Sequence, residues 1–128
     1  MPSASVDQLP VGAEMDGYEA RSVEWGDTTI VFENMSSAAD PAPLFVGLPD
    51  DSCQCEHYGY LFEGELVVRY ADKEETITAG QAYYLPPGHR PLVRSTARSV
   101  EFTRTAELNE TMAVVMKNIE NGAMPIPL

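Results

Sequence analysis

Hydrophobic residues in the central part of the chain come in short runs separated by turn-forming residues. Tyr18–Trp25 and Thr28–Phe32 are rich in β-branched and aromatic residues and flank Gly26 and Asp27, a pattern typical of two strands joined by a turn. Further predicted strands are Tyr58–Phe62, Leu66–Tyr70, Glu75–Thr78, Ala82–Leu85, Leu92–Arg94 and Ser99–Arg104. Many short strands with Gly and Pro turns predict an all-β sandwich or small barrel over residues 17–105.

Two expectations concern the middle of this region. The segment Glu63–Glu65 contains Gly64 between two predicted strands, which predicts a hairpin turn. Tyr58, Tyr60 and Phe62 alternate along a predicted strand and therefore share one of its faces. Because aromatic residues in a small barrel usually pack in its core, we expect these three side chains to be buried.

The two ends of the chain have different patterns. Residues 1–16 carry few large apolar groups and are expected to form a flexible arm. Residues 106–128 are expected to form a C-terminal helix, from about Ala106 to Asn121, and an extended tail. Apolar residues recur there at steps of three and four, as on one face of a helix that packs against the barrel or a second subunit. They are Leu108, Met112, Val115, Met116 and Ile119.

The charge of the chain excludes some classes of partner. Among 128 residues there are 8 Lys and Arg against 20 Asp and Glu, for a net charge of −12. Such a surface repels phosphate backbones and anionic membranes, so we expect neither nucleic acid nor a membrane as a partner. No apolar run approaches the roughly 18–20 residues that span a bilayer, and the N-terminus does not resemble a secretory signal. A cytoplasmic protein is therefore expected.

The residues best suited to chemistry are the two cysteines and the two histidines. Cys53, Cys55 and His57 stand at alternate positions, so in an extended segment their side chains line one wall. His89 follows a Pro-Pro-Gly turn that could return it to that wall. Thiolate and imidazole donors suit Zn²⁺ first, and Fe and Cu(I) are the other metals that fit.

The cysteines could also have one of two roles that involve no metal. A disulfide between Cys53 and Cys55 would close a very small, strained ring. Alternatively, both cysteines could be buried as small apolar residues without a ligand. The coincidence of two thiols and an imidazole at alternate positions favours metal binding.

Two segments resemble a known family. Gly47–Glu65 resembles the first sequence motif of the cupin superfamily, and Gly80–His89 resembles the second. Together the resemblance covers about a third of the chain. It implies a jelly-roll β-barrel with a metal near its centre, often in a homodimer. The Cys-Gln-Cys segment and the C-terminal helix are similar to a group of small bacterial single-domain cupins.

The usual ligand positions of these motifs are all altered. The first cupin motif places two His two residues apart, then Glu, then Gly seven residues later. The corresponding glycine in this chain is Gly64. Counted back from it, the three ligand places are Asp51, Cys53 and His57. In the second motif the ligand place falls on Pro91, two residues after His89. Because several substitutes are themselves ligands, we interpret the site as rebuilt for another metal.

The sequence therefore predicts a small metal-binding cupin-like protein that takes a small organic ligand or substrate. The alternative is a non-catalytic barrel that binds a small ligand or senses metal or redox state, with a structural metal or none. If Cys53, Cys55, His57 and His89 all bound Zn²⁺, the site would be saturated and structural, whereas three ligands would leave a position open for water. No catalytic residue is assigned, and an enzyme is not distinguished from a binding protein.

Overall fold

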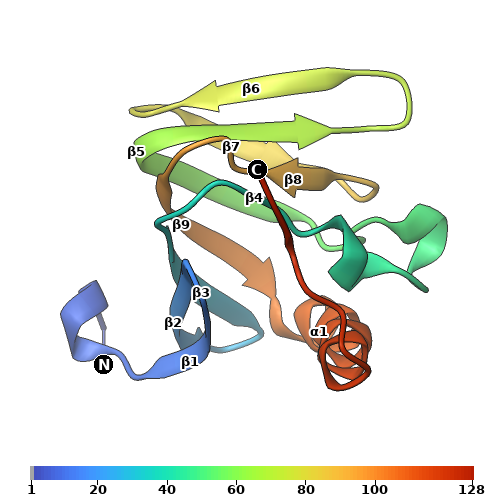
Figure 1. Cartoon of the computed structure of the whole chain (residues 1–128). Helices are drawn as coiled ribbons and strands as arrows, with labels where there is room; N and C mark the ends of the chain where they lie inside the picture. Colours follow the sequence, from blue (N-terminus) through green and yellow to red (C-terminus); the bar gives the residue numbers. More distant parts are fainter. Residues whose placement is uncertain (1) are drawn as a thin grey trace.

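The computed structural model describes residues 2–128, which form mainly strands and one C-terminal helix, α1 (Thr105–Glu120) (Figure 1). The strands are β1 Val11–Met15, β2 Tyr18–Trp25, β3 Thr28–Met35, β4 Ala39–Asp40, β5 His57–Arg69, β6 Glu74–Thr78, β7 Ala82–Leu85, β8 Arg90–Leu92, β9 Ala97–Arg104 and β10 Ile126–Pro127. Short 3₁₀ helices lie at Val6–Gln8, Ala42–Phe45 and Pro49–Asp51. Within the described residues, no helix is long and apolar enough to cross a membrane. The mostly-β class with a C-terminal helix is confirmed.

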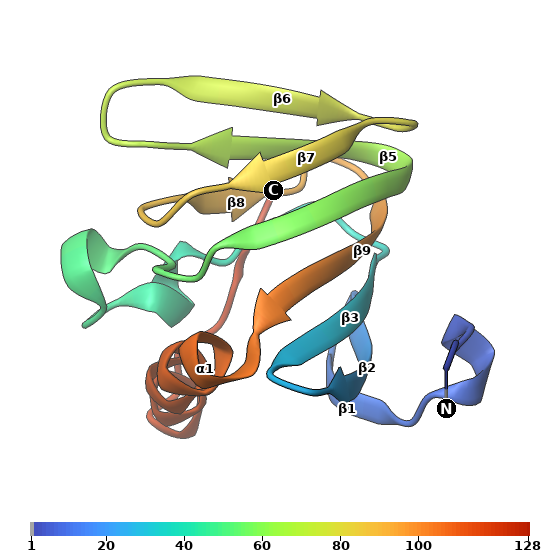
Figure 2. The ribbon, with the colours of Figure 1, turned by 180° about the vertical axis from the view of Figure 1, so that it is seen from behind.

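The strands form two layers that share β5 (Figure 2). One layer has the antiparallel order β1-β2-β3-β9-β5, with β7 on the other side of the first half of β5. In the other layer, the second half of β5 pairs with β6 and β8. The main hydrogen-bonded order runs from β1 to β6, and no pairing joins these two strands. The layers therefore enclose an interior without closing a continuous ring of strands.

The predicted hairpin at Glu63–Glu65 is wrong, because β5 continues through it as one bent strand. Its register against β9 shifts between Leu61 and Glu63, as at a β-bulge. Gly64 follows with φ 81, and a Cβ at this position would overlap the carbonyl oxygen of Thr96. Only glycine adopts this conformation without cost, so Gly64 is the point at which β5 passes from one layer to the other.

The ends of the chain also differ from the sequence-based prediction. The flexible arm was expected over residues 1–16, of which residue 1 lies outside the described part. This segment contains β1, which pairs with β2. The pairing uses backbone hydrogen bonds and needs no large apolar side chain. Helix α1 begins one residue before its predicted start, and Val115 is buried as expected. Met116 is exposed, whereas Thr111 is buried, so the inward face of α1 is rotated from the predicted one.

The apolar core lies at the end of the molecule where β5 bends. It contains Leu61, Leu66, Val68, Ile77, Leu85, Val93 and Ala97. Burial of such side chains is the main source of folding free energy, at about 25 cal/mol per Å² of apolar surface. The other end of the interior is available for polar side chains.

At that other end the hydrophobic pattern of the sheet is inverted. Glu101 and Thr103 of β9 are buried, while Phe102 between them is 43% exposed. The predicted burial of the aromatic residues of β5 is wrong as well, since Tyr58, which pairs with Phe102, is 58% exposed. Alternation is the reason: placing His57 inside puts its neighbour Tyr58 outside.

Candidate metal centre

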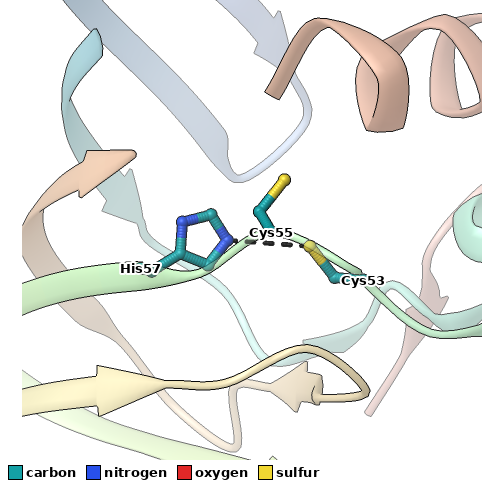
Figure 3. Close-up of side chains that lie close together, drawn as sticks. All are labelled: Cys53, Cys55 and His57. Atoms are coloured by element: carbon teal, nitrogen blue, oxygen red, sulfur yellow. Dashed lines mark hydrogen bonds between the residues drawn. The ribbon is translucent and has the colours of Figure 1, made fainter. Parts of the chain in front are cut away.

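Cys53 and Cys55 lie in the segment that leads into β5, and His57 is the first residue of that strand. The backbone N–H of Cys53 donates to the carbonyl oxygen of His89 at 3.0 Å, in an isolated antiparallel bridge. Cys53, Cys55 and His57 are all buried, and the two residues between them are partly exposed. The side chains therefore lie on one side of the segment, as the alternation predicts (Figure 3).

These three side chains bring their ligand atoms together. One ligand atom from each of Cys53, Cys55 and His57 lies within 4.8 Å of the other two. The Nε2 atom of His57 is 3.6 Å from Sγ of Cys53 (Figure 3). In the part of the chain that the structure describes, no other group of three His, Cys, Asp or Glu side chains converges in this way.

The ring of His57 is oriented by two neighbours on β9. Its Nδ1 atom is 2.5 Å from the hydroxyl of Thr103 and 3.5 Å from a carboxyl oxygen of Glu101. Burial lowers the pKa of His57. In the neutral tautomer with the proton on Nδ1, Thr103 and Glu101 can accept that proton and the Nε2 lone pair faces Cys53, which is the form that binds a metal.

Helix α1 contributes the surroundings of Cys55. Its thiol donates to the Thr111 hydroxyl at 3.2 Å and lies 3.4 Å from the carbonyl oxygen of Glu107. The hydrogen bond from Cys53 lowers the pKa of Cys55, while the same contact and burial raise the pKa of Cys53.

His89 lies beside this group of three rather than within it. Its side chain is 1% exposed, and its ring centroid is 5.0 Å from that of His57. Its Nδ1 atom bonds to the carbonyl oxygen of Pro86 at 2.7 Å, so Nε2 is the free ring nitrogen. Burial lowers the pKa of His89 to about 4, which keeps the ring neutral. Its predicted role as a fourth ligand stays a prediction.

Sequence reasoning missed a polar network next to His57. Tyr83 donates to Glu101 at 2.7 Å, and Tyr18 donates to Glu33 at 2.5 Å. Burial raises the pKa of Glu33 to about 8, and it also raises that of Glu101. The alternation of polar residues along β9 could have signalled an inward polar face, but Glu33 carried no comparable signal.

Comparison with known proteins identifies the fold. No protein-family model and no curated protein matches the sequence. Among solved structures, the chain is similar to an RmlC-like cupin from Shewanella frigidimarina, with TM-score 0.58, 13% identity, and 79% of this chain and 87% of that chain covered. The EutQ protein of Clostridium difficile is similar with TM-score 0.56, 12% identity and coverages of 80% and 85%.

A variant of oxalate decarboxylase from Bacillus subtilis is similar with TM-score 0.61 and 16% identity, over 84% of this chain and 31% of that one. The chain has a cupin fold. At these identities the similarity establishes the fold and not an activity. The cupin fold that the two sequence motifs imply is thereby confirmed.

Cys53 and His57 are spaced like two ligands of one tetrahedral metal ion. Zn–S bonds of about 2.3 Å and Zn–N bonds of about 2.05 Å at a tetrahedral angle place sulfur and nitrogen about 3.6 Å apart. The separation of Cys53 Sγ and His57 Nε2 is 3.6 Å. Cys53, Cys55 and His57 would hold such an ion, and Thr103 and Glu101 would support His57 as its outer partners. When bound, the ion would supply Lewis-acid chemistry or structural cross-linking.

Proposed function

We propose that this chain is a small metal-binding jelly-roll cupin whose metal is held by Cys53, Cys55 and His57. The observation that carries the proposal is the convergence of three buried ligand atoms within 4.8 Å. Two thiolates and one imidazole form a soft to borderline donor set, which favours Zn²⁺ over the hard cations Mg²⁺ and Ca²⁺. Fe and Cu(I) are the alternatives that the same donors would accept.

His89 decides whether the proposed site is closed or open. With His89 as a fourth ligand, Zn²⁺ would be saturated and its role structural. With three ligands, the ion would keep one position open for water or a small molecule. The convergence of three ligand atoms without His89 supports the open form.

Metal content of purified variants tests the proposal. Wild-type protein purified with zinc present is expected to hold stoichiometric zinc, measured by mass spectrometry of the native protein. Cys53→Ala and His57→Ala are expected to lose it, because two remaining ligands bind zinc weakly. Glu56→Gln is the matched control, since it lies between the ligands in sequence and is only partly buried. Zinc retained in both ligand variants would refute the site.

His89→Ala then separates the closed site from the open one. If zinc content and affinity are unchanged in this variant, the three-ligand site is supported. A loss as large as that of His57→Ala would show that His89 is a ligand and that the site is closed. A cobalt-substituted protein gives the coordination number independently, through the intensity of its visible absorption bands.

A small organic molecule is the proposed partner of the open site. The interior next to His57 is lined by Tyr83, Glu101 and Glu33, which is a polar surface that a structural metal does not require. This feature supports ligand binding over a purely structural role. Whether the ligand is transformed or only bound is tested by comparing bound ligand before and after incubation with the zinc-loaded protein.

We also propose that the chain forms a homodimer through the exposed outer face of the β7-β5-β9 layer. Large aromatic side chains gather on this face, and contiguous exposed apolar surface is typical of protein interfaces. They are Tyr58, Tyr60, Phe62, Tyr84 and Phe102. The proposed location is the cytoplasm, which is supported by the two cysteines, since both are free thiols.

A further inference from the structure

Gly59 lies in the first half of β5, at a position where the backbone does not require glycine. Unlike Gly64 of the same strand, Gly59 does not have a positive φ. Glycine inside a strand is destabilising, because it loses more conformational freedom on folding than other residues and packs no side chain. A glycine at such a position indicates that another group occupies the space of its side chain.

The group that occupies this space is the phenol ring of Tyr83. Gly59 pairs with Tyr83 of β7 on one side and with Glu101 of β9 on the other, so the three residues form one row across three neighbouring strands (Figure 2). A Cβ on Gly59 would overlap the ring of Tyr83 and its hydroxyl oxygen. The ring therefore crosses β5 directly over Gly59, and its hydroxyl reaches the strand beyond.

The hydroxyl of Tyr83 holds one end of the Glu101 carboxyl group. It donates to Oε2 of Glu101 at 2.7 Å, while Oε1 of the same group is 3.5 Å from Nδ1 of His57. Burial raises the pKa of Tyr83, so the hydroxyl keeps its proton and stays a donor. One carboxyl oxygen is thus turned toward Tyr83 and the other toward His57, and the first contact fixes the rotation that produces the second.

The orientation of the His57 ring is what the proposed metal centre depends on. Its Nε2 atom faces Sγ of Cys53 at 3.6 Å because Nδ1 lies on the side of Thr103 and Glu101. Partners of the non-ligating nitrogen commonly fix the orientation of a metal-bound imidazole. Tyr83 is one contact further from the metal than these partners, and it acts on the ligand through Glu101 alone.

We propose that Gly59 and Tyr83 are positioning residues of the metal centre. Gly59 leaves the space in which the ring of Tyr83 crosses β5. The hydroxyl of Tyr83 then holds Glu101 against His57, which keeps Nε2 of the imidazole directed at the metal. The inference rests on the proposed function, because it assigns these two residues a role toward the metal that His57 would bind. It requires a residue without a side chain at position 59 and a tyrosine at position 83 together.

Tyr83→Phe tests the hydroxyl, because the substitution keeps the ring. Loss of one hydrogen bond corresponds to about 2- to 12-fold in zinc affinity, measured by competition with a chromophoric chelator. The lower part of this range is expected, since Thr103 still contacts Nδ1 of His57. The visible bands of the cobalt-substituted variant should also shift, because the imidazole is no longer held in one orientation.

Tyr84→Phe is the matched control for this variant. It removes a hydroxyl from the next residue of β7, which donates at 2.8 Å to Glu56, a carboxyl that is not a proposed ligand. Zinc affinity and the cobalt spectrum are expected to stay as in the wild-type protein. Unchanged zinc affinity in Tyr83→Phe, or an equal loss in Tyr84→Phe, would overturn the inference.

Gly59→Ala tests the space that the ring occupies. The added Cβ displaces the ring, so zinc affinity should fall at least as far as in Tyr83→Phe, and the midpoint of thermal denaturation should fall as well. In Tyr83→Leu the ring is absent, and adding Gly59→Ala to this variant should lower neither quantity further. Gly12→Ala on β1, where the added Cβ meets only ordinary contacts, is the control and should leave zinc affinity unchanged.

The double variant keeps the test decisive even if Gly59→Ala alone does not fold. A further loss of zinc affinity on adding Gly59→Ala to Tyr83→Leu would overturn the role of Gly59. Absence of zinc from the wild-type protein would overturn the metal centre and this inference together. Zinc bound by the wild-type protein and bound equally well by Tyr83→Phe would overturn the inference alone.

Discussion

Replacing Thr103 by Val is expected to weaken zinc binding without touching a ligand. The hydroxyl of Thr103 lies 2.5 Å from Nδ1 of His57, and Val keeps the shape and β-branch of Thr while removing this partner. In the metal-free variant, the ring can move its proton from Nδ1 to Nε2, so that the proton is no longer aimed at an apolar group. The zinc-bound form cannot do so because the metal occupies Nε2, and the penalty therefore falls on binding.

The magnitude follows from the cost of an unsatisfied buried donor, which is about 1–3 kcal/mol. At about 1.4 kcal/mol for each tenfold change in affinity, this range corresponds to roughly 5- to 150-fold. A carboxyl oxygen of Glu101 is 3.5 Å from the same nitrogen and can take over part of the interaction. We therefore expect the lower part of that range, about 5- to 30-fold weaker binding.

Competition with a chromophoric zinc chelator measures this change, and the thiolate charge-transfer bands of the cobalt form show whether the ligands stay in place. Thr29→Val is the matched control. Thr29 faces Thr103 across β3 and β9 and is equally buried, but its hydroxyl bonds to Thr105 at 2.7 Å rather than to a ligand. Equal loss of affinity in both variants, or none in Thr103→Val, would refute the role assigned to Thr103.

Three further predictions concern other parts of the molecule. Gly64→Ala is expected to lower the free energy of unfolding by about 2 kcal/mol or more because the added Cβ overlaps the carbonyl oxygen of Thr96; Gly80→Ala, also at positive φ but with open space around it, should cost about 1 kcal/mol in chemical denaturation. Burial raises the pKa of Glu33 from 4.5 to about 8, so the folded chain retains a proton that the unfolded chain releases. Stability should therefore fall as the pH rises through this range, and Glu33→Gln should flatten that dependence in thermal denaturation. Sedimentation equilibrium should show a wild-type dimer and a monomeric Tyr58→Lys variant, and a wild-type monomer at micromolar concentration would contradict the proposed interface.

The parts of this molecule that depend on local sequence could be predicted. Alternation of Cys53, Cys55 and His57 requires only an extended segment to place three ligands on one side, and the structure has that segment. Helix α1 follows from its apolar repeat and ends at Glu120, one residue before the predicted end. The second cupin-like motif indicated the fold because its Gly80 and Gly88 lie in turns between strands, whereas Gly64 of the first motif lies at a bend within β5.

The parts that depend on strand register could not be predicted. Glu33 and Glu101 are 68 positions apart and become neighbours only because β3 pairs with β9. Gly64 is predicted to form a turn because sequence does not distinguish a reversal of direction from a bend within one strand. The inward side of β9 is equally ambiguous: Phe102 is the residue that hydrophobicity places inside, and the structure places Glu101 and Thr103 there instead.

The inverted pattern has a physical cause in the way that the interior is divided. Leu61, Val68 and Ala97 pack around the bend of β5 and supply hydrophobic stabilisation at one end of the interior. The other end can therefore carry polar groups whose burial is unfavourable by itself, such as Glu101 beside His57. Placing those groups inside forces their strand neighbours, including Phe102 and Tyr58, to the outer face. The exposed aromatic surface and the polar interior are thus two consequences of one choice of register, so a ligand site inside and an apolar interface outside are expected to occur together in this protein.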